Sequence, residues 1–246
     1  MKWRFALAAL SLLTAFGAFA ETTNTLSEAE IQGRQLAQKI LEQHPEKDFT
    51  NSGILQIRDV NGKRSEIPIR FQIIVEELNS LNWLSSYQTI ITNKEVRLMV
   101  IHPPDTGLIG YRLFENGSEK DLARNEIMIP FANSDFWIAD LGLEFFHWPE
   151  QKILKHDMKR GRSCQVLEST NPNPSTNGYS RVVSWIDNET LGIVHAEAYD
   201  FKNKLLKEFD PKSFKKVNGQ WELQEMEIRN DQTGSRTRLE FDVKKE

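Results

Sequence analysis

The sequence is poor in cysteine and has no excess of basic charge. Cys164 is the single cysteine among 246 residues, so no disulfide can form within one chain and no Cys/His cluster can hold a structural zinc ion. The 31 Lys+Arg stand against 35 Asp+Glu, which gives a net charge of −4. Proteins that bind nucleic acid through general attraction to phosphates carry a basic surplus. We therefore expect no disulfide, no metal site and no nucleic-acid partner.

Signature motifs of catalysis and cofactor binding are also missing. There is no GxSxG, HExxH, GxxxxGK[ST] or calcium-loop pattern, and no GxGxxG follows a strand. The nine-residue separation of His147 and His156 does not match a helical metal pair. We predict no cofactor and no enzyme activity. The alternative, an exported hydrolase, would have to use the nearest reactive groups, Asp135, Asp140, Glu144, His147 and Cys164.

The first twenty residues have the pattern of a secretory signal peptide. Lys2 and Arg4 precede an apolar run from Phe5 to Phe16, and Ala18-Phe19-Ala20 is a small-x-small cleavage site. A single membrane anchor is the alternative, but the run is shorter than the roughly 20 residues that span a bilayer. We predict cleavage after Ala20 and export to the periplasm. Residues 21–246 are then expected to form a single domain.

The exported part is predicted to begin with one helix and to continue mainly as strands. Ser27 and Glu30 form a capping box, an apolar stripe follows, and His44-Pro45 ends the helix. From there apolar residues alternate with polar ones, first in residues 67–75 and most clearly again in 236–243, which is typical of strands with one buried face.

Turn residues indicate that these strands follow one another as an antiparallel meander. Asn61-Gly62 and Asn218-Gly219 suit two-residue hairpin turns with two positive φ angles, and Asn116-Gly117 and Thr233-Gly234 are further turn signals. The connections are mostly too short for crossover helices. The predicted strands are 53–59, 65–76, 85–92, 95–102, 108–114, 152–158, 163–169, 179–187, 192–201, 204–209, 213–217, 221–229 and 235–243.

Aromatic residues are concentrated in one segment that breaks the strand pattern. Six of the chain's 24 aromatics fall between Phe131 and Trp148, and residues 140–146 could form a short helix. One interpretation is that the segment packs against the sheet as core. The other is that it lines or covers an apolar ligand cavity. The candidate lipid-binding residues are Phe131, Phe136, Trp137, Leu141, Phe145, Phe146 and Trp148.

A basic stretch follows the aromatic segment. It can be a solvated hairpin tip with its turn at Lys159-Arg160-Gly161, or a docking patch for anionic headgroups or an acidic partner. The candidate docking residues are Lys155, Lys159, Arg160 and Arg162.

The chain resembles the outer-membrane lipoprotein-sorting family, the LolA-like periplasmic carriers, over roughly Leu26 to Val243 and most strongly after Phe131. The resemblance rests on residues 161–168, the stretch from Tyr179 to Trp185-Ile186-Asp187, Glu197-Ala198-Tyr199-Asp200 with Leu206-Lys207, then Trp221, Met226 and Thr237, and on Asn133-Ser134-Asp135-Phe136 followed by a short helix. It implies a mainly β (α+β) fold. The expected architecture is an incomplete antiparallel β-barrel open on one side, with an N-terminal helix and short helices covering the concave face. Arg58 and Arg70 are the possible counterparts of the arginine that such carriers use to hold a lid closed.

The resemblance also implies a function. Carriers of this family bind acyl chains in the apolar cavity and move lipoproteins between the inner and outer membranes. Lipid or acylated lipoprotein is then the expected cargo, and an inner-membrane transporter is a possible partner. The alternative is a non-enzymatic accessory or assembly module that serves a membrane lipid transporter and uses the aromatic segment as an exposed surface.

Overall fold

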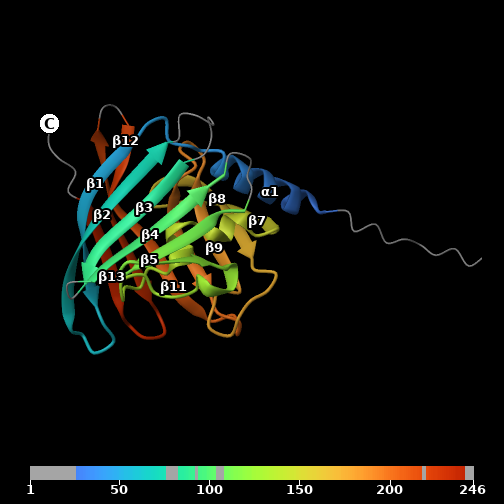
Figure 1. The fold of residues 1–246 in the computed structure, drawn as a ribbon. Coiled ribbons are helices and arrows are strands. Elements are labelled where there is room, and N and C mark those ends of the chain that lie inside the picture. The colour runs from blue at the N-terminus through green and yellow to red at the C-terminus, as the bar shows by residue number, and fades with distance from the viewer. Residues whose placement is uncertain (1–25, 76–82, 92–93, 104–107, 218–219, 242–246) are drawn as a thin grey trace, which may run out of the picture.

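A computed structural model describes residues 26–75, 83–91, 94–103, 108–217 and 220–241 (Figure 1). The predicted signal peptide, the predicted Asn218-Gly219 turn and Val243 lie outside these residues. Within the described part of the chain, no helix is both long enough and apolar enough to span a bilayer.

Helix α1 (Glu28–Leu41) begins where the capping box predicts. The Ser27 hydroxyl accepts the Glu30 amide at 3.3 Å, and the Glu30 carboxylate accepts the Ser27 amide at 2.7 Å. The buried side of the helix packs against strand β7 and the neighbouring 3-10 helix η3. Gly33 makes this approach possible, because a Cβ atom there would lie 2.5 Å from the backbone nitrogen of Lys152.

The strands form one antiparallel sheet of thirteen members in the order β6-β5-β4-β3-β2-β1-β13-β12-β11-β10-β9-β8-β7. All neighbours except β1 and β13 are consecutive in the chain, which confirms the predicted meander. The strands are β1 (Phe49–Arg58), β2 (Arg64–Val75), β3 (Trp83–Ile91), β4 (Lys94–His102), β5 (Gly110–Glu115), β6 (Ser118–Leu122), β7 (Glu150–Lys159), β8 (Arg162–Thr170), β9 (Arg181–Asp187), β10 (Ile193–Tyr199), β11 (Leu205–Val217), β12 (Gln220–Asn230) and β13 (Arg236–Phe241).

The two edges of the sheet, β6 and β7, are joined by a segment that crosses one face of the sheet. It contains η2 (Arg124–Glu126), α2 (Ile138–Leu141) and η3 (Glu144–His147). In a flat sheet β5 and β7 would lie about 50 Å apart at the usual strand spacing. Yet Glu144 of this segment bonds to Tyr111 of β5, and Gln151 of β7 bonds to the Phe145 carbonyl. The sheet is therefore strongly curved around the segment, as Figure 1 shows.

Alternate residues along each strand point to the two faces of this curved sheet. Leu55, Ile69, Leu98, Ile228 and Leu239 belong to the inner face and join the main core with the crossing segment. The predicted alternation in β2 and β13 is confirmed by these positions. Cys164, Val166, Val183 and Trp185 form a separate small cluster, which we assign to the outer face.

Four details differ from the sequence-based expectations, and three of them concern turns and strands. The Asn61-Gly62 turn is longer than two residues, because Asp59 Oδ1 accepts the amides of Asn61 and Lys63 at 2.9 Å and only Gly62 takes a positive φ. Strand β6 was not predicted, since its sequence SEKDL is polar, as suits an exposed edge. The predicted strands 204–209 and 213–217 are one strand, β11, in which a register shift accommodates Pro211.

The predicted helix over residues 140–146 is two shorter helices. Leu143 takes a φ of 50°, a left-handed conformation that interrupts the helical path between α2 and η3. Turns predicted elsewhere are confirmed: Asn116-Gly117 and Arg160-Gly161 both have two consecutive positive φ angles, as tight hairpins require.

Candidate ligand-binding site

Residues 127–149, which we call the cover segment, fill the concave face of the sheet. Its first part is a tight loop in which the Phe131 amide bonds to the Phe136 carbonyl at 2.7 Å. Ala132 and Asn133 take positive φ angles within this loop. Helices α2 and η3 then carry the chain towards β7. The six aromatic residues between Phe131 and Trp148 thus lie on a short, compact insert and not on a strand.

The candidate lipid-binding side chains of the cover segment face the sheet. Phe131, Phe136, Phe145 and Phe146 are each 2–3% exposed, and Trp148 is 6% exposed. Trp137 and Leu141 are partly buried and pack against the same core. The rings also contact aromatic residues outside the segment: the ring centroids of Phe131 and Tyr87 of β3 lie 6.4 Å apart, and Trp137 stacks on Tyr179, just before β9, at 4.6 Å. In this conformation the cover segment itself occupies the apolar concave surface.

A buried ion pair joins the cover segment to strand β11 of the sheet. Lys207 of β11 is fully buried, and its Nζ lies 3.3 Å from Asp140 Oδ2 and 2.6 Å from the Asp135 carbonyl oxygen. The ammonium also lies 3.7 Å from the Trp137 ring centroid, a cation–π contact. Burial lowers the pKa of Lys207 to about 8 and raises the pKa of Asp140, while the attraction between the two charges opposes both shifts. Each charge is therefore held by the other in a site without water contact.

Asp140 also organises the start of α2. Its Oδ2 accepts the Trp137 amide at 2.7 Å, and its Oδ1 accepts the Tyr179 hydroxyl at 2.9 Å. Burial, followed by the charge of Asp140, raises the pKa of Tyr179 well above its ordinary value, so this phenol stays a hydrogen-bond donor. One carboxylate thus connects the helix, Tyr179 and Lys207.

Polar contacts of Asp135 and Glu144 also hold the cover segment. Asp135 accepts hydrogen bonds from Ser235 at 2.6 Å and from Thr237 at 2.8 Å, and its amide donates back to the Thr237 hydroxyl at 2.8 Å. Glu144 accepts the Tyr111 hydroxyl at 3.0 Å and pairs with Arg124 at 3.3 Å. Burial raises the pKa of Glu144, and the charge of Arg124 opposes that rise. The cover segment is therefore bonded to strands on both sides of the barrel.

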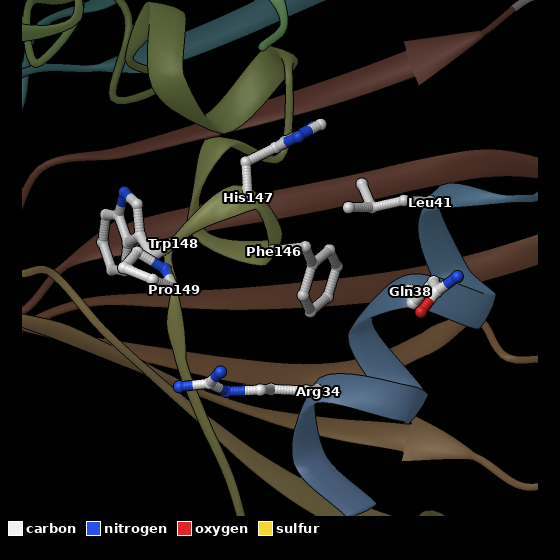
Figure 2. A pocket seen from close by; sticks show the side chains of 7 residues that line it. All are labelled: Arg34, Gln38, Leu41, Phe146, His147, Trp148 and Pro149. Atoms are coloured by element: carbon white, nitrogen blue, oxygen red, sulfur yellow. The ribbon is translucent and has the colours of Figure 1, made fainter. Parts of the chain in front are cut away.

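A shallow pocket of about 310 Å³ lies where α1 meets the end of the cover segment. Figure 2 shows Arg34 reaching from α1 towards the side formed by Trp148 and Pro149. Burial lowers the pKa of His147 at this pocket to about 4, and its Nε2 atom has no hydrogen-bond partner among the described residues. The pocket combines apolar walls with one exposed cation. Its lining residues are Arg34, Gln38, Leu41, Phe146, His147, Trp148 and Pro149.

The candidate docking residues lie on the β7–β8 hairpin and have partners within the chain. Lys155 pairs with Asp157 at 2.8 Å, and Lys159 lies 4.5 Å from the centroid of the Trp185 ring. Arg160 pairs with Asp210 at 2.7 Å, and Arg162 pairs with Asp187 at 2.5 Å. Their charges are therefore largely balanced within the protein.

The acidic groups considered for a hydrolase bond to different partners. Asp135 bonds to β13, Asp140 to Lys207 and Glu144 to Tyr111. Cys164 is fully buried on strand β8, and burial raises the pKa of its thiol. It belongs to the separate outer-face cluster, away from the cover segment.

The buried cation that contacts the cover segment differs from the two arginines expected from the sequence. Arg58 and Arg70, the two arginines considered for that role, are exposed. Lys207 contacts Asp135, Asp140 and Trp137 of that segment, and the resemblance included Leu206-Lys207 without giving this lysine a role. The signal available was its alternation with Phe209, because residues two apart in a strand share a face.

Solved structures show the class of fold that this arrangement represents. A DUF1329 family protein from Desulfovibrio piger ATCC 29098 aligns with a TM-score of 0.71 at 17% identity, over 89% of this chain and 96% of its own. A domain named for outer membrane lipoprotein sorting, from Vibrio parahaemolyticus, aligns with a TM-score of 0.70 at 20% identity, over 88% and 95%. A LolA superfamily protein from Nitrosomonas europaea gives 0.57 at 14% identity, over 85% and 91%. The fold is the open barrel of LolA-like proteins, which confirms the resemblance seen in the sequence.

A family model also matches the sequence. The model, which is described as an uncharacterized protein, matches residues 117–245, slightly more than half of the chain. The chain belongs to that family. No curated protein matches the sequence.

Proposed function

We propose that this protein is a periplasmic carrier that binds the acyl chains of lipids or lipoproteins on the concave face of its barrel and shuttles them between the two membranes. The observation that carries the proposal is the cover segment, which places its aromatic residues against that face. Lipid or acylated lipoprotein is the cargo, and an inner-membrane transporter is a fitting partner for loading. The protein acts without catalysis.

Binding would exchange the aromatic side chains of the cover segment for an acyl chain on the same concave face. When the cover segment moves away, its aromatic side chains leave a concave apolar wall, and an acyl chain can replace them. Each methylene buried there contributes about 0.8 kcal/mol. The pocket beside Arg34 lies at the end of the cover segment, where it offers a cation to an anionic headgroup.

The placement of the aromatic residues supports a carrier over an assembly module. An assembly module would present those rings on an exposed surface for a partner. Here Phe131, Phe136, Phe145 and Phe146 are almost fully buried against the sheet. Their burial supports a surface that is uncovered only when cargo enters.

The experiment is to measure binding of a fluorescent fatty acid and to identify lipids that stay bound to the purified protein by native mass spectrometry. Thr237→Val removes both hydrogen bonds between that hydroxyl and Asp135. It should weaken closure of the cover segment and so raise the apparent affinity for the probe several-fold. Thr190→Val is the matched control, since its hydroxyl bonds to Asp187 outside the cover segment. No bound lipid and no probe binding, in the wild type and in Thr237→Val, would rule the carrier out.

A further inference from the structure

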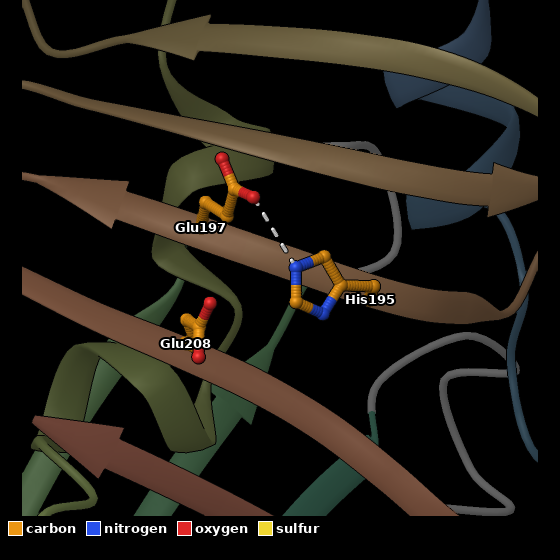
Figure 3. Close-up of side chains that lie close together, drawn as sticks. All are labelled: His195, Glu197 and Glu208. Atoms are coloured by element: carbon orange, nitrogen blue, oxygen red, sulfur yellow. Dashed lines mark hydrogen bonds and ion pairs between the residues drawn. The ribbon is translucent and has the colours of Figure 1, made fainter. Parts of the chain in front are cut away.

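The outer face of the barrel carries a cluster of metal-binding side chains opposite the cover segment. His195 and Glu197 lie two residues apart on β10, so they share one face of the sheet, and Glu208 comes from the adjacent strand β11. One ligand atom from each residue lies within 4.8 Å of the others. Figure 3 shows the three side chains gathered over the two strands.

The register of the two strands brings two negative charges together. Glu197 and Glu208 are directly opposite each other in the β10–β11 ladder. Like charges in such a pair destabilise an antiparallel sheet. Glu208 Oε2 pairs with Arg229 at 2.6 Å, while Glu197 Oε2 accepts the Tyr199 hydroxyl at 2.5 Å. A divalent cation between the two carboxylates would remove their repulsion.

The His195 ring has the hydrogen-bonding pattern of a metal-binding histidine, with a carboxylate on Nδ1. Its Nδ1 lies 2.7 Å from Asp210 Oδ1, and Asp210 is itself fixed by Arg160 at 2.7 Å and Lys212 at 3.3 Å. A carboxylate on Nδ1 holds the tautomer in which Nε2 has a free lone pair. That Nε2 faces Glu197 at 3.4 Å, which is longer than the 2.7–2.9 Å of a strong charged hydrogen bond. The imidazole is only 7% exposed, so its direction is set by the protein.

We propose that His195 Nε2, Glu197 and Glu208 bind a zinc ion, with Asp210 orienting the histidine. Imidazole nitrogen and carboxylate oxygen are ordinary zinc ligands, at about 2.0–2.2 Å from the metal. Ligand atoms of a tetrahedral site then lie about 3.4 Å apart, so a small rotation of the glutamate side chains brings the present cluster into range. Three protein ligands leave a fourth position for water or for a ligand from outside. This site lies on the face opposite the cover segment and does not depend on the carrier function.

No metal site was expected from the sequence, because its histidines are neither clustered nor at helical spacing. Two of these ligands are i and i+2 on a strand, and the third comes from the next strand. Such a site is visible only when the register is known.

The test is titration of the tag-free, metal-stripped protein with zinc, followed by calorimetry, and with cobalt, followed by its visible absorption. We expect one zinc ion per chain and a rise in the melting temperature when zinc is added. Glu208→Gln and His195→Gln should each weaken binding at least tenfold, and Asp210→Asn should weaken it about 10- to 100-fold. His156→Gln is the control, because His156 is an exposed histidine on the β7 strand.

Glu208→Gln keeps the size of the side chain and the His195–Asp210 pair, so it remains informative if His195→Gln does not fold. The proposal is overturned if the wild type binds no zinc, or if zinc binds equally well to the wild type, Glu208→Gln and His195→Gln. Loss of zinc binding in both variants, with His156→Gln unchanged, supports it.

Discussion

The two faces of strand β11 differ in how deeply their charged side chains are buried. Lys207 points to the inner face, where it is fully buried and held by Asp140 and the Trp137 ring. Glu208 and Asp210 point to the outer face, where their side chains are 24% and 21% exposed and pair with cations near water. A buried charge has no water to replace a lost partner, whereas a charge at the surface does. The inner pair should therefore control whether the cover segment stays in place, and outer pairs should matter little to stability.

The largest effect should come from removing Asp140. Asp140→Ala leaves the Lys207 ammonium buried without its counter-charge and also removes the acceptor for Trp137 and Tyr179. We expect a loss of about 3–5 kcal/mol in the free energy of unfolding, measured by urea denaturation at pH 7.

The double variant Asp140→Leu with Lys207→Met separates charge from shape. Replacing a buried ion pair by apolar residues of similar volume often restores stability. The double variant should therefore be more stable than Asp140→Ala. A loss below about 1 kcal/mol in Asp140→Ala would contradict the role given to the pair.

A smaller effect is expected where α1 closes the edge of the covered face. Gly33→Ala places a Cβ atom 2.5 Å from the Lys152 nitrogen and 2.6 Å from the Gln151 carbonyl carbon, both backbone atoms that cannot turn away. The helix must move off β7, so we expect a loss of about 1–3 kcal/mol by urea denaturation. Gln35→Ala, at an exposed position of the same helix, is the control and should change stability by less than about 0.5 kcal/mol. Equal stabilities of the two variants would show that α1 is not held tightly to β7.

The buried histidines His102 and His147 should make the stability of the protein fall in acid. Burial lowers the pKa of His102 to about 3 and that of His147 to about 4, against about 6.5 in an unfolded chain. Between these values the unfolded chain binds more protons than the folded one, so stability falls as the pH is lowered from 6.5 towards 4. Each histidine should contribute about 1 kcal/mol per pH unit, or less where water reaches the ring.

The measurement is urea denaturation at several pH values between 7 and 4.5. His102→Gln with His147→Gln should flatten the dependence, while His156→Gln, on an exposed ring, should leave it unchanged. An equally steep dependence in the double variant would assign the acid sensitivity to other groups.

Much of the fold could be predicted from local patterns. The capping box at Ser27 and Glu30 fixes the start of α1, and alternation at Thr237, Leu239 and Phe241 fixes a face of β13, because both signals depend on neighbours in the chain. Strand β6 and the continuity of β11 through Pro211 were missed, since edge pairing and a bulge depend on the partner strand.

The candidate site was predictable in composition but not in assembly. The aromatic density between Phe131 and Trp148 identified the cover segment, because apolar rings in a non-strand segment need a surface to cover. The partners that hold it, Lys207 and Thr237, lie 67 to 102 residues from Asp140 and Asp135 along the chain. Only the curvature of the sheet brings them together.

The smallest effect should come from breaking an exposed lysine–aspartate pair on the outer face, Lys155 with Asp157. Lys155→Ala removes the 2.8 Å contact with Asp157, in which the lysine side chain is 58% exposed. Asp157 keeps the Trp185 indole N–H at 3.1 Å and the Met158 amide at 2.9 Å, so it is not left without partners. We expect a change below about 0.5 kcal/mol in urea denaturation at low salt, and none at 0.5 M salt, because exposed pairs are weak and screened. A loss approaching that of Asp140→Ala would mean that the outer face contributes to stability as strongly as the inner one, and the contrast between the two faces of β11 would not extend to the rest of the barrel.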